Sequence, residues 1–75
     1  MPSAYILINC EPGCERAIID ELKALPVADL SLVYGICDIV AKVESDTMSK
    51  FQRHISSIRK IDKIKSSLTV MIVEG

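Results

Sequence analysis

Apolar and polar residues follow two different periods along this chain. Some segments are continuously apolar or alternate between apolar and polar residues, which is typical of β-strands. These segments are Ala4–Cys10, Val27–Val33, Ile36–Glu44 and Ile64–Glu74. Two other segments repeat apolar residues every three or four positions, which predicts amphipathic helices. Their apolar faces consist of Cys14, Ala17, Ile18, Leu22 and Leu25 in the first, and of Met48, Phe51, Ile55 and Ile58 in the second.

Turn and capping residues separate these segments. Pro12-Gly13 ends the first strand, and Pro12 is expected in the first turn of the next helix, where its missing N–H would have no partner anyway. Pro26 ends that helix, and Ser45-Asp46-Thr47 offers an N-cap to the second helix. Gly35 is expected to turn the second strand into the third, since glycine readily adopts a positive φ.

The element order is therefore strand, helix, strand, strand, helix, strand. Two split βαβ units of this kind predict an α+β, ferredoxin-like βαββαβ sandwich, in which a four-stranded antiparallel sheet carries both helices on one face. Right-handed crossovers place the first and third strands at the centre. The other face of the sheet is then uncovered, and its candidate residues are Tyr5, Leu7, Val33 and Val40. Pairing with the sheet of a second copy, as in a dimeric α/β barrel, would bury them.

Length and composition limit the number of domains and the classes of partner. With 75 residues, the chain is expected to form a single domain, residues 1–75. A domain this small buries only about 60% of its unfolded surface, and 49% of its residues are hydrophobic, so an oligomer interface is expected. The net charge of −1 argues against nucleic acid as a partner.

Cysteine usage and hydropathy predict a cytoplasmic location. Cys10, Cys14 and Cys37 form an odd set, which does not suit a secreted disulfide framework. No signal peptide and no apolar run of membrane-spanning length is recognised, so no membrane partner is expected. The separation of Cys10 from Cys14 is not that of a zinc-binding pair. We therefore expect buried free thiols, with no metal and no cofactor.

One stretch, Val33–Val43, contains a candidate binding group. Asp38 follows Gly35 by three residues and lies near the start of the third predicted strand, where aspartate is uncommon. A carboxylate beside a glycine turn is a plausible ligand-binding group. Turn aspartates also accept hydrogen bonds from nearby backbone amides, so a purely structural interpretation stays open.

The chain resembles the C-terminal effector-binding module of the Lrp/AsnC family of amino-acid-responsive transcription regulators. The matching segments are Ala4–Ile8, Pro12-Gly13, Glu21–Lys23, Val33–Val43, Asp46, and Ile64–Val73 with Ser67-Leu68-Thr69 inside it. The resemblance implies homodimers that assemble into octamers or decamer-like rings, with a free amino acid bound between dimers. By position, the effector contacts would come from Tyr34, Gly35, Asp38, Ser67 and Thr69.

The resemblance does not extend to direct DNA binding. Full-length family members carry an N-terminal helix-turn-helix domain, whereas only Met1 to Ser3 precede the first predicted strand. A stand-alone module is therefore expected, one that binds an amino acid, assembles with full-length Lrp/AsnC regulators, or only forms rings. Cys37 occupies a turn position where the family often has a larger or acidic residue, so the choice of effector is open.

Other functions of this topology are weighed by the residues they require. RNA recognition needs exposed aromatic residues on both central strands, and the third predicted strand has none. A nucleophilic enzyme needs an activating base, but His54 lies beside the apolar stripe of the second helix, so no catalytic residue is expected. An ACT-type regulatory domain and a purely structural oligomerisation module without ligand remain the alternatives to an amino-acid-binding module.

Overall fold

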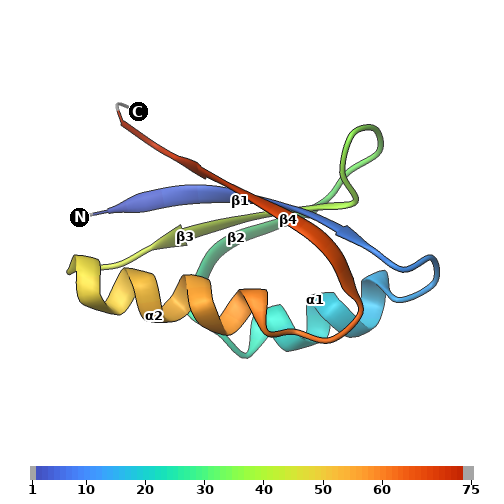
Figure 1. Ribbon diagram of the computed structural model, residues 1–75, viewed down its shortest axis with the longest axis horizontal. Coiled ribbons are helices and arrows are strands. Elements are labelled where there is room, and N and C mark those ends of the chain that lie inside the picture. Colours follow the sequence, from blue (N-terminus) through green and yellow to red (C-terminus); the bar gives the residue numbers. More distant parts are fainter. Residues whose placement is uncertain (1, 74–75) are drawn as a thin grey trace.

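The computed structural model describes residues 2–73 and has its elements in the predicted order. They are β1 (Ser3–Cys10), α1 (Glu15–Lys23), β2 (Val27–Leu32), β3 (Ile39–Glu44), α2 (Met48–Arg59) and β4 (Ile64–Met71). The strands form one antiparallel sheet in the order β2-β3-β1-β4, so β3 and β1 are central. Figure 1 shows α1 and α2 together on one side of this sheet. The predicted ferredoxin-like α+β fold is confirmed.

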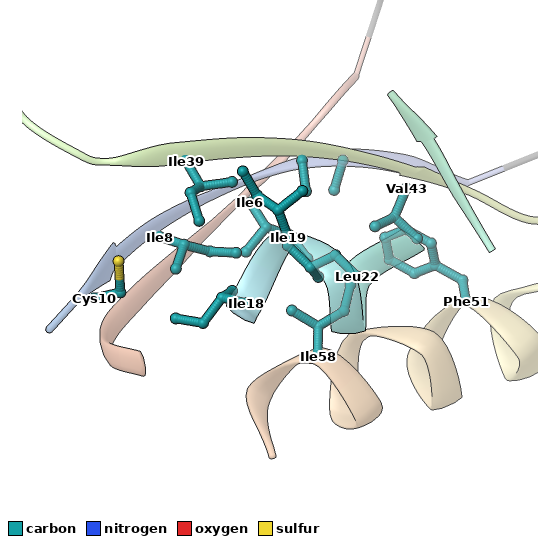
Figure 2. Close-up of a cluster of buried hydrophobic side chains, with 12 residues drawn as sticks. Ile6, Ile8, Cys10, Ile18, Ile19, Leu22, Ile39, Val43, Phe51 and Ile58 are labelled. Atoms are coloured by element: carbon teal, nitrogen blue, oxygen red, sulfur yellow. The ribbon is translucent and has the colours of Figure 1, made fainter. Parts of the chain in front are cut away.

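The core lies between the sheet and the helices. Along β1 every second residue is buried and faces the helices, as period-two alternation requires: Ala4, Ile6, Ile8 and Cys10. Figure 2 shows the side chains of the sheet meeting those of the helices: Ile6, Ile8, Ile39 and Val43 from the strands, and Ile18, Ile19, Leu22, Phe51 and Ile58 from the helices. Burying one such side chain stabilises the fold by about 1.5–3 kcal/mol, so this layer provides most of the driving force for folding.

α1 begins later than the sequence predicts. Pro12 and Gly13 form a turn ahead of the helix, and Gly13 has a φ of +85°, which favours glycine. The N–H of Gly13 donates to the carboxylate of Glu15, the first helical residue. The prediction that Pro12 lies in the first turn of the helix is therefore wrong. Cys14 takes the N-cap position, without a side-chain cap bond.

The buried face of α1 also differs from the predicted one. Ile18 and Leu22 are buried as expected, but Ala17 is exposed and Ile19 is buried in its place. Cys14 is only half-buried, because it precedes the helix instead of lying on its apolar stripe. The buried face of α1 therefore includes both Ile18 and Ile19. A spacing of three and four residues counted from Cys14 predicts Ala17 instead of Ile19.

β2 and β3 are joined by a loop of residues 33–38, here called the hairpin loop, and not by a tight turn. Regular pairing ends at Leu32 and Ile39, so the predicted extension of strands over residues 33 and 36–38 is wrong. The N–H of Val33 donates to the carbonyl of Asp38 at 2.9 Å and closes the loop. Only the alternation of burial holds, since Cys37 and Ile39 are buried whereas Asp38 and Val40 are half-buried.

The ends of α2 and β4 complete the comparison. Thr47 is the N-cap of α2, with its Oγ1 accepting the Lys50 N–H at 3.2 Å, as the capping signal predicts. Met48, predicted on the buried face, is half exposed. β4 ends at Met71, although the Ile72 N–H still donates to the Ser3 carbonyl. The predicted strand end at Glu74 lies outside the described residues. Within residues 2–73, no helix is long and apolar enough to cross a membrane.

Candidate functional site

The hairpin loop has an exposed tip. Tyr34 and Ile36 are almost completely accessible to solvent, although both have large side chains that are mostly apolar. Between them Gly35 has a φ of +142°, in the region that strains other residues, while a Cβ built there would meet nothing within 4 Å. Glycine is therefore required by the backbone angle and not by crowding. Figure 1 shows the loop projecting beyond the sheet, away from the helices.

Asp38 anchors the base of this loop through three hydrogen bonds. Its carboxylate Oδ2 accepts the backbone N–H of Cys10 at 3.0 Å, its own N–H donates to the Ile8 carbonyl at 2.9 Å, and its carbonyl accepts from Val33. The carboxylate thus takes the place of a backbone carbonyl at the end of the β1–β3 ladder. This geometry fits the structural interpretation of Asp38.

The charge on Asp38 also affects a neighbouring thiol. The pKa of Cys10 is raised above 9.0, first by burial and then by the negative charge of Asp38 beside it. Cys10 and Cys37 are buried, as predicted, whereas Cys14 is not. Among residues 2–73, no three side chains of the His, Cys, Asp or Glu types are grouped as a metal site.

Ser67 and Thr69 lie on the helix side of β4. They are opposite Ile8 and Ile6 of β1, which are fully buried against the helices. The two side chains share one face, as their two-residue spacing predicts. Since β1 lies between β3 and β4, it separates this pair from Asp38 within one chain. The five candidate ligand residues therefore form two groups, one on the hairpin loop and one on β4.

A groove of about 700 Å³, here called the α2–β4 groove, runs beside Ser67 and Thr69. Polar side chains of α2 line it, namely Gln52, Ser56 and Arg59. Sequence reasoning missed these three residues. Their three- and four-residue spacing forms a polar stripe on α2, but only the fold shows that this stripe faces the edge strand β4.

The sheet face opposite the helices, here called the open face, carries the predicted interface residues. Val40 is opposite Leu7, and both are half-buried, while Tyr5 is 41% exposed. The β4 residues opposite Leu7 and Tyr5 are also apolar and exposed, Leu68 at 60% and Val70 at 44%. Sequence reasoning missed them, although the alternation of Leu68 and Val70 with Ser67 and Thr69 could have indicated that they face outward.

Two further residues refine this surface. Val33, the remaining predicted interface residue, lies in the hairpin loop with 37% of its side chain exposed. The Lys42 ammonium lies 5.8 Å from the centroid of the Tyr5 ring, over the open face. The open face is thus an apolar patch with a cation at its edge.

His54 has a partner that explains its position. Its Nδ1 lies 2.8 Å from Oγ of Ser45, a buried residue whose N–H donates to the Pro2 carbonyl. This pair links the start of β1, the end of β3 and the middle of α2. The arrangement is that of a structural contact between layers and not of a base beside a nucleophile in a cleft.

Fold and surface together define a ferredoxin-like α+β domain whose sheet has one helix-covered face and one open apolar face. The crystal structure of FFRP-DM1 matches it with a TM-score of 0.89 and 35% sequence identity, over 97% of this chain and 100% of that one. A hypothetical protein from Pyrococcus horikoshii gives the same TM-score at 34% identity, over 100% of this chain and 93% of that one. The chain belongs to the Lrp/AsnC family.

Longer proteins contain a segment that matches this chain. AsnC of Escherichia coli, 22% identical, has the same fold with a TM-score of 0.85 over 99% of this chain and 52% of that one. An uncharacterised HTH-type transcriptional regulator of Pyrococcus abyssi is 35% identical over 71 residues, which make up 92% of this chain. The chain spans 45% of the length of that curated relative. No protein-family model matches the chain.

Proposed function

We propose that this chain is an Lrp/AsnC-type regulatory module that forms homo-oligomers and binds a free amino acid at an interface between subunits. The observation that carries the proposal is the apolar open face, on which Tyr5, Leu68 and Val70 are exposed. A domain of 75 residues has little core, so covering this face with a second copy adds burial that the monomer lacks.

Two kinds of contact build the proposed assembly. Open faces pair first, with Leu7 and Val40 near the centre of the dimer. The hairpin loop then joins dimers into an octamer or a decamer-like ring, because the nearly full exposure of Tyr34 and Ile36 suits an intersubunit contact. The same surfaces suit mixed assembly with full-length Lrp/AsnC regulators. We expect no direct, sequence-specific binding of duplex DNA by this chain.

Sedimentation of a face variant tests the dimer. Val70→Lys places a charge among the exposed apolar residues of the open face, and we expect it to shift the protein to monomers at micromolar concentration. Ser49→Lys, on the exposed side of α2, is the matched control and is expected to sediment like the wild type. A wild-type protein that stays monomeric at every concentration contradicts the dimer.

The proposed effector site combines the two groups of candidate residues from different subunits. Asp38 of one subunit uses its second carboxylate oxygen to bind the ammonium group of the amino acid. Backbone amides near Gly35 bind the effector carboxylate, because the missing side chain permits close approach. Ser67 and Thr69 of a neighbouring subunit add hydroxyl groups. A second subunit is needed, since β1 separates the two groups within one chain.

A thermal-shift screen of the twenty amino acids identifies the effector. A ligand that binds only the native state raises the melting temperature by mass action. Calorimetry then compares Asp38→Asn with Asp20→Asn, an exposed aspartate of α1. We expect at least a tenfold loss of affinity for Asp38→Asn, because the ammonium group of the effector loses the negative charge with which it pairs. We expect no loss of affinity for Asp20→Asn.

One observation favours a second candidate, the structural oligomerisation module without ligand. The Asp38 carboxylate already has a partner in the Cys10 N–H, so its conformation needs no effector. This candidate is preferred if the protein forms oligomers but no amino acid shifts its melting temperature. An ACT-type assignment has less support than either, given the membership in the Lrp/AsnC family.

A further inference from the structure

The α2–β4 groove has one apolar end and one cationic end. A short turn, residues 60–63, joins α2 to β4, so the helix and the strand run in opposite directions. Arg59 and Ser56, near the end of α2, line the groove together with Ser67 in the first half of β4. Met48, at the start of α2, lies beside Met71, at the end of β4.

The cationic end has unused hydrogen-bonding capacity. Arg59 is exposed and forms no ion pair with any residue from 2 to 73, and no acidic residue lines the groove. Thr69 lines it further along, and its Oγ1 is buried without a hydrogen-bond partner in the described structure. A guanidinium group beside serine and threonine hydroxyls matches a carboxylate, which accepts two hydrogen bonds from one arginine.

Beyond Arg59, Ser56 and Ser67 the groove is long, and its lining is mainly apolar apart from Gln52 and Thr69. Phe51 forms part of its lining, and Met48, Leu68 and Met71 line it with side chains that are 46–60% exposed. Along β4, the distance from Ser67 to Met71 is about 13 Å at roughly 3.3 Å per residue. Methionine adapts its shape to irregular aliphatic ligands. The volume of about 700 Å³ is within the range of small-molecule sites.

From this polarity we infer that the α2–β4 groove binds an aliphatic monocarboxylate of medium chain length. The carboxylate lies at Arg59 and Ser67, and the chain extends toward Met48 and Met71. The inference goes beyond the proposed function, because this site lies within one protomer and needs neither Asp38 nor the hairpin loop. Most of its β4 lining lies on the helix side of the sheet, since Ser67 and Met71 are opposite helix-facing residues of β1, whereas Leu68 borders the open face as well.

Calorimetry with octanoate tests the inference on the wild-type protein. Octanamide, which has the same chain without the charge, is expected to bind at least tenfold more weakly, because it cannot pair with a guanidinium group as an anion. Butyrate is expected to bind at least tenfold more weakly as well, since each methylene buried in the groove contributes up to about fourfold in affinity. Amide chemical-shift changes should map to β4 and to α2.

A matched pair of arginine variants tests the carboxylate contact. Arg59→Gln removes the charge from the groove, and we expect at least a tenfold loss of octanoate affinity. Arg53→Gln makes the same change on α2 outside the groove and should bind octanoate like the wild type. Both residues are exposed, so circular dichroism should report folded variants.

The opposite results overturn the inference. They are no octanoate binding by the wild type, equal binding of octanoate and octanamide, equal binding by Arg59→Gln and Arg53→Gln, or shift changes confined to the hairpin loop. The experiment uses no amino acid and no Asp38 variant. The two sites share Ser67 and Thr69, but only the groove site requires Arg59 and only the site between subunits requires Asp38, so the failure of one is distinguishable from the failure of the other.

Discussion

Removing the Asp38 carboxylate should lower stability, even in the absence of any ligand. In Asp38→Ala the backbone N–H of Cys10, a residue with 5% exposure, loses the acceptor that now lies 3.0 Å away. Leaving a buried donor without a partner costs about 1–3 kcal/mol. The two backbone hydrogen bonds of Asp38, to Ile8 and from Val33, do not depend on its side chain and remain.

This loss is large for so small a domain. At 0.05–0.15 kcal/mol per residue, a chain of this length has a free energy of unfolding of roughly 4–11 kcal/mol. Asp38→Ala should therefore stay folded, with a melting temperature lowered by about 4–8 °C for each kcal/mol lost. Asp38→Asn retains an acceptor oxygen without the charge and should lose about half as much, since charge-assisted bonds are roughly twice as strong.

Urea unfolding at a fixed protein concentration measures the difference, because association would otherwise change the apparent stability. Asp20→Ala, an exposed aspartate on α1, is the control and is expected within about 0.5 kcal/mol of the wild type. Equal stability of Asp38→Ala and Asp20→Ala would refute the anchoring role of the carboxylate. It would then favour the interpretation that Asp38 is retained for binding alone.

Three other outcomes are expected. In urea unfolding, Thr47→Ala should lower the free energy of unfolding by about 1 kcal/mol, because the Lys50 N–H loses its acceptor. Thr47→Ser keeps a hydroxyl acceptor and should retain most of this stabilisation. With a disulfide reagent near neutral pH, Cys14 should react before the buried Cys10; faster labelling of Cys10 in the native state contradicts its burial. The free energy of unfolding should fall as the pH rises above about 9, where the unfolded chain releases the Cys10 proton that the folded chain retains, and Cys10→Ala should lessen this fall.

The sequence predicted the parts of the fold that depend on hydrophobic period. Strand and helix order, the central position of β1 and β3, and the helix-facing residues of β3 all follow from alternation and from the handedness of crossovers. It could not predict where the β1–β3 pairing ends. That boundary depends on a side-chain acceptor, Asp38, replacing a backbone acceptor for Cys10, a contact between residues far apart in the chain.

The candidate site was predictable only in part. Gly35 and Asp38 stand out as residue types that are uncommon in strands, and Ser67 and Thr69 do share a face. Their division between opposite sides of β1 follows from strand order combined with register. Arg59 carries no distinguishing signal in the sequence, since a basic residue in the last turn of a helix is favourable wherever it occurs.

The central position of β1 has a consequence for how the protein is made. β1 is synthesised first, yet Ala4 pairs on one side with Val43 and on the other with Met71, almost a full chain length away. Most contacts of the sheet are therefore remote in sequence, and such pairings form slowly. While β4 is still inside the ribosome, β1 presents an unpaired apolar edge in solution. Folding of this module must then await the emergence of β4, and until that point the exposed nascent strand is where chaperones would be needed.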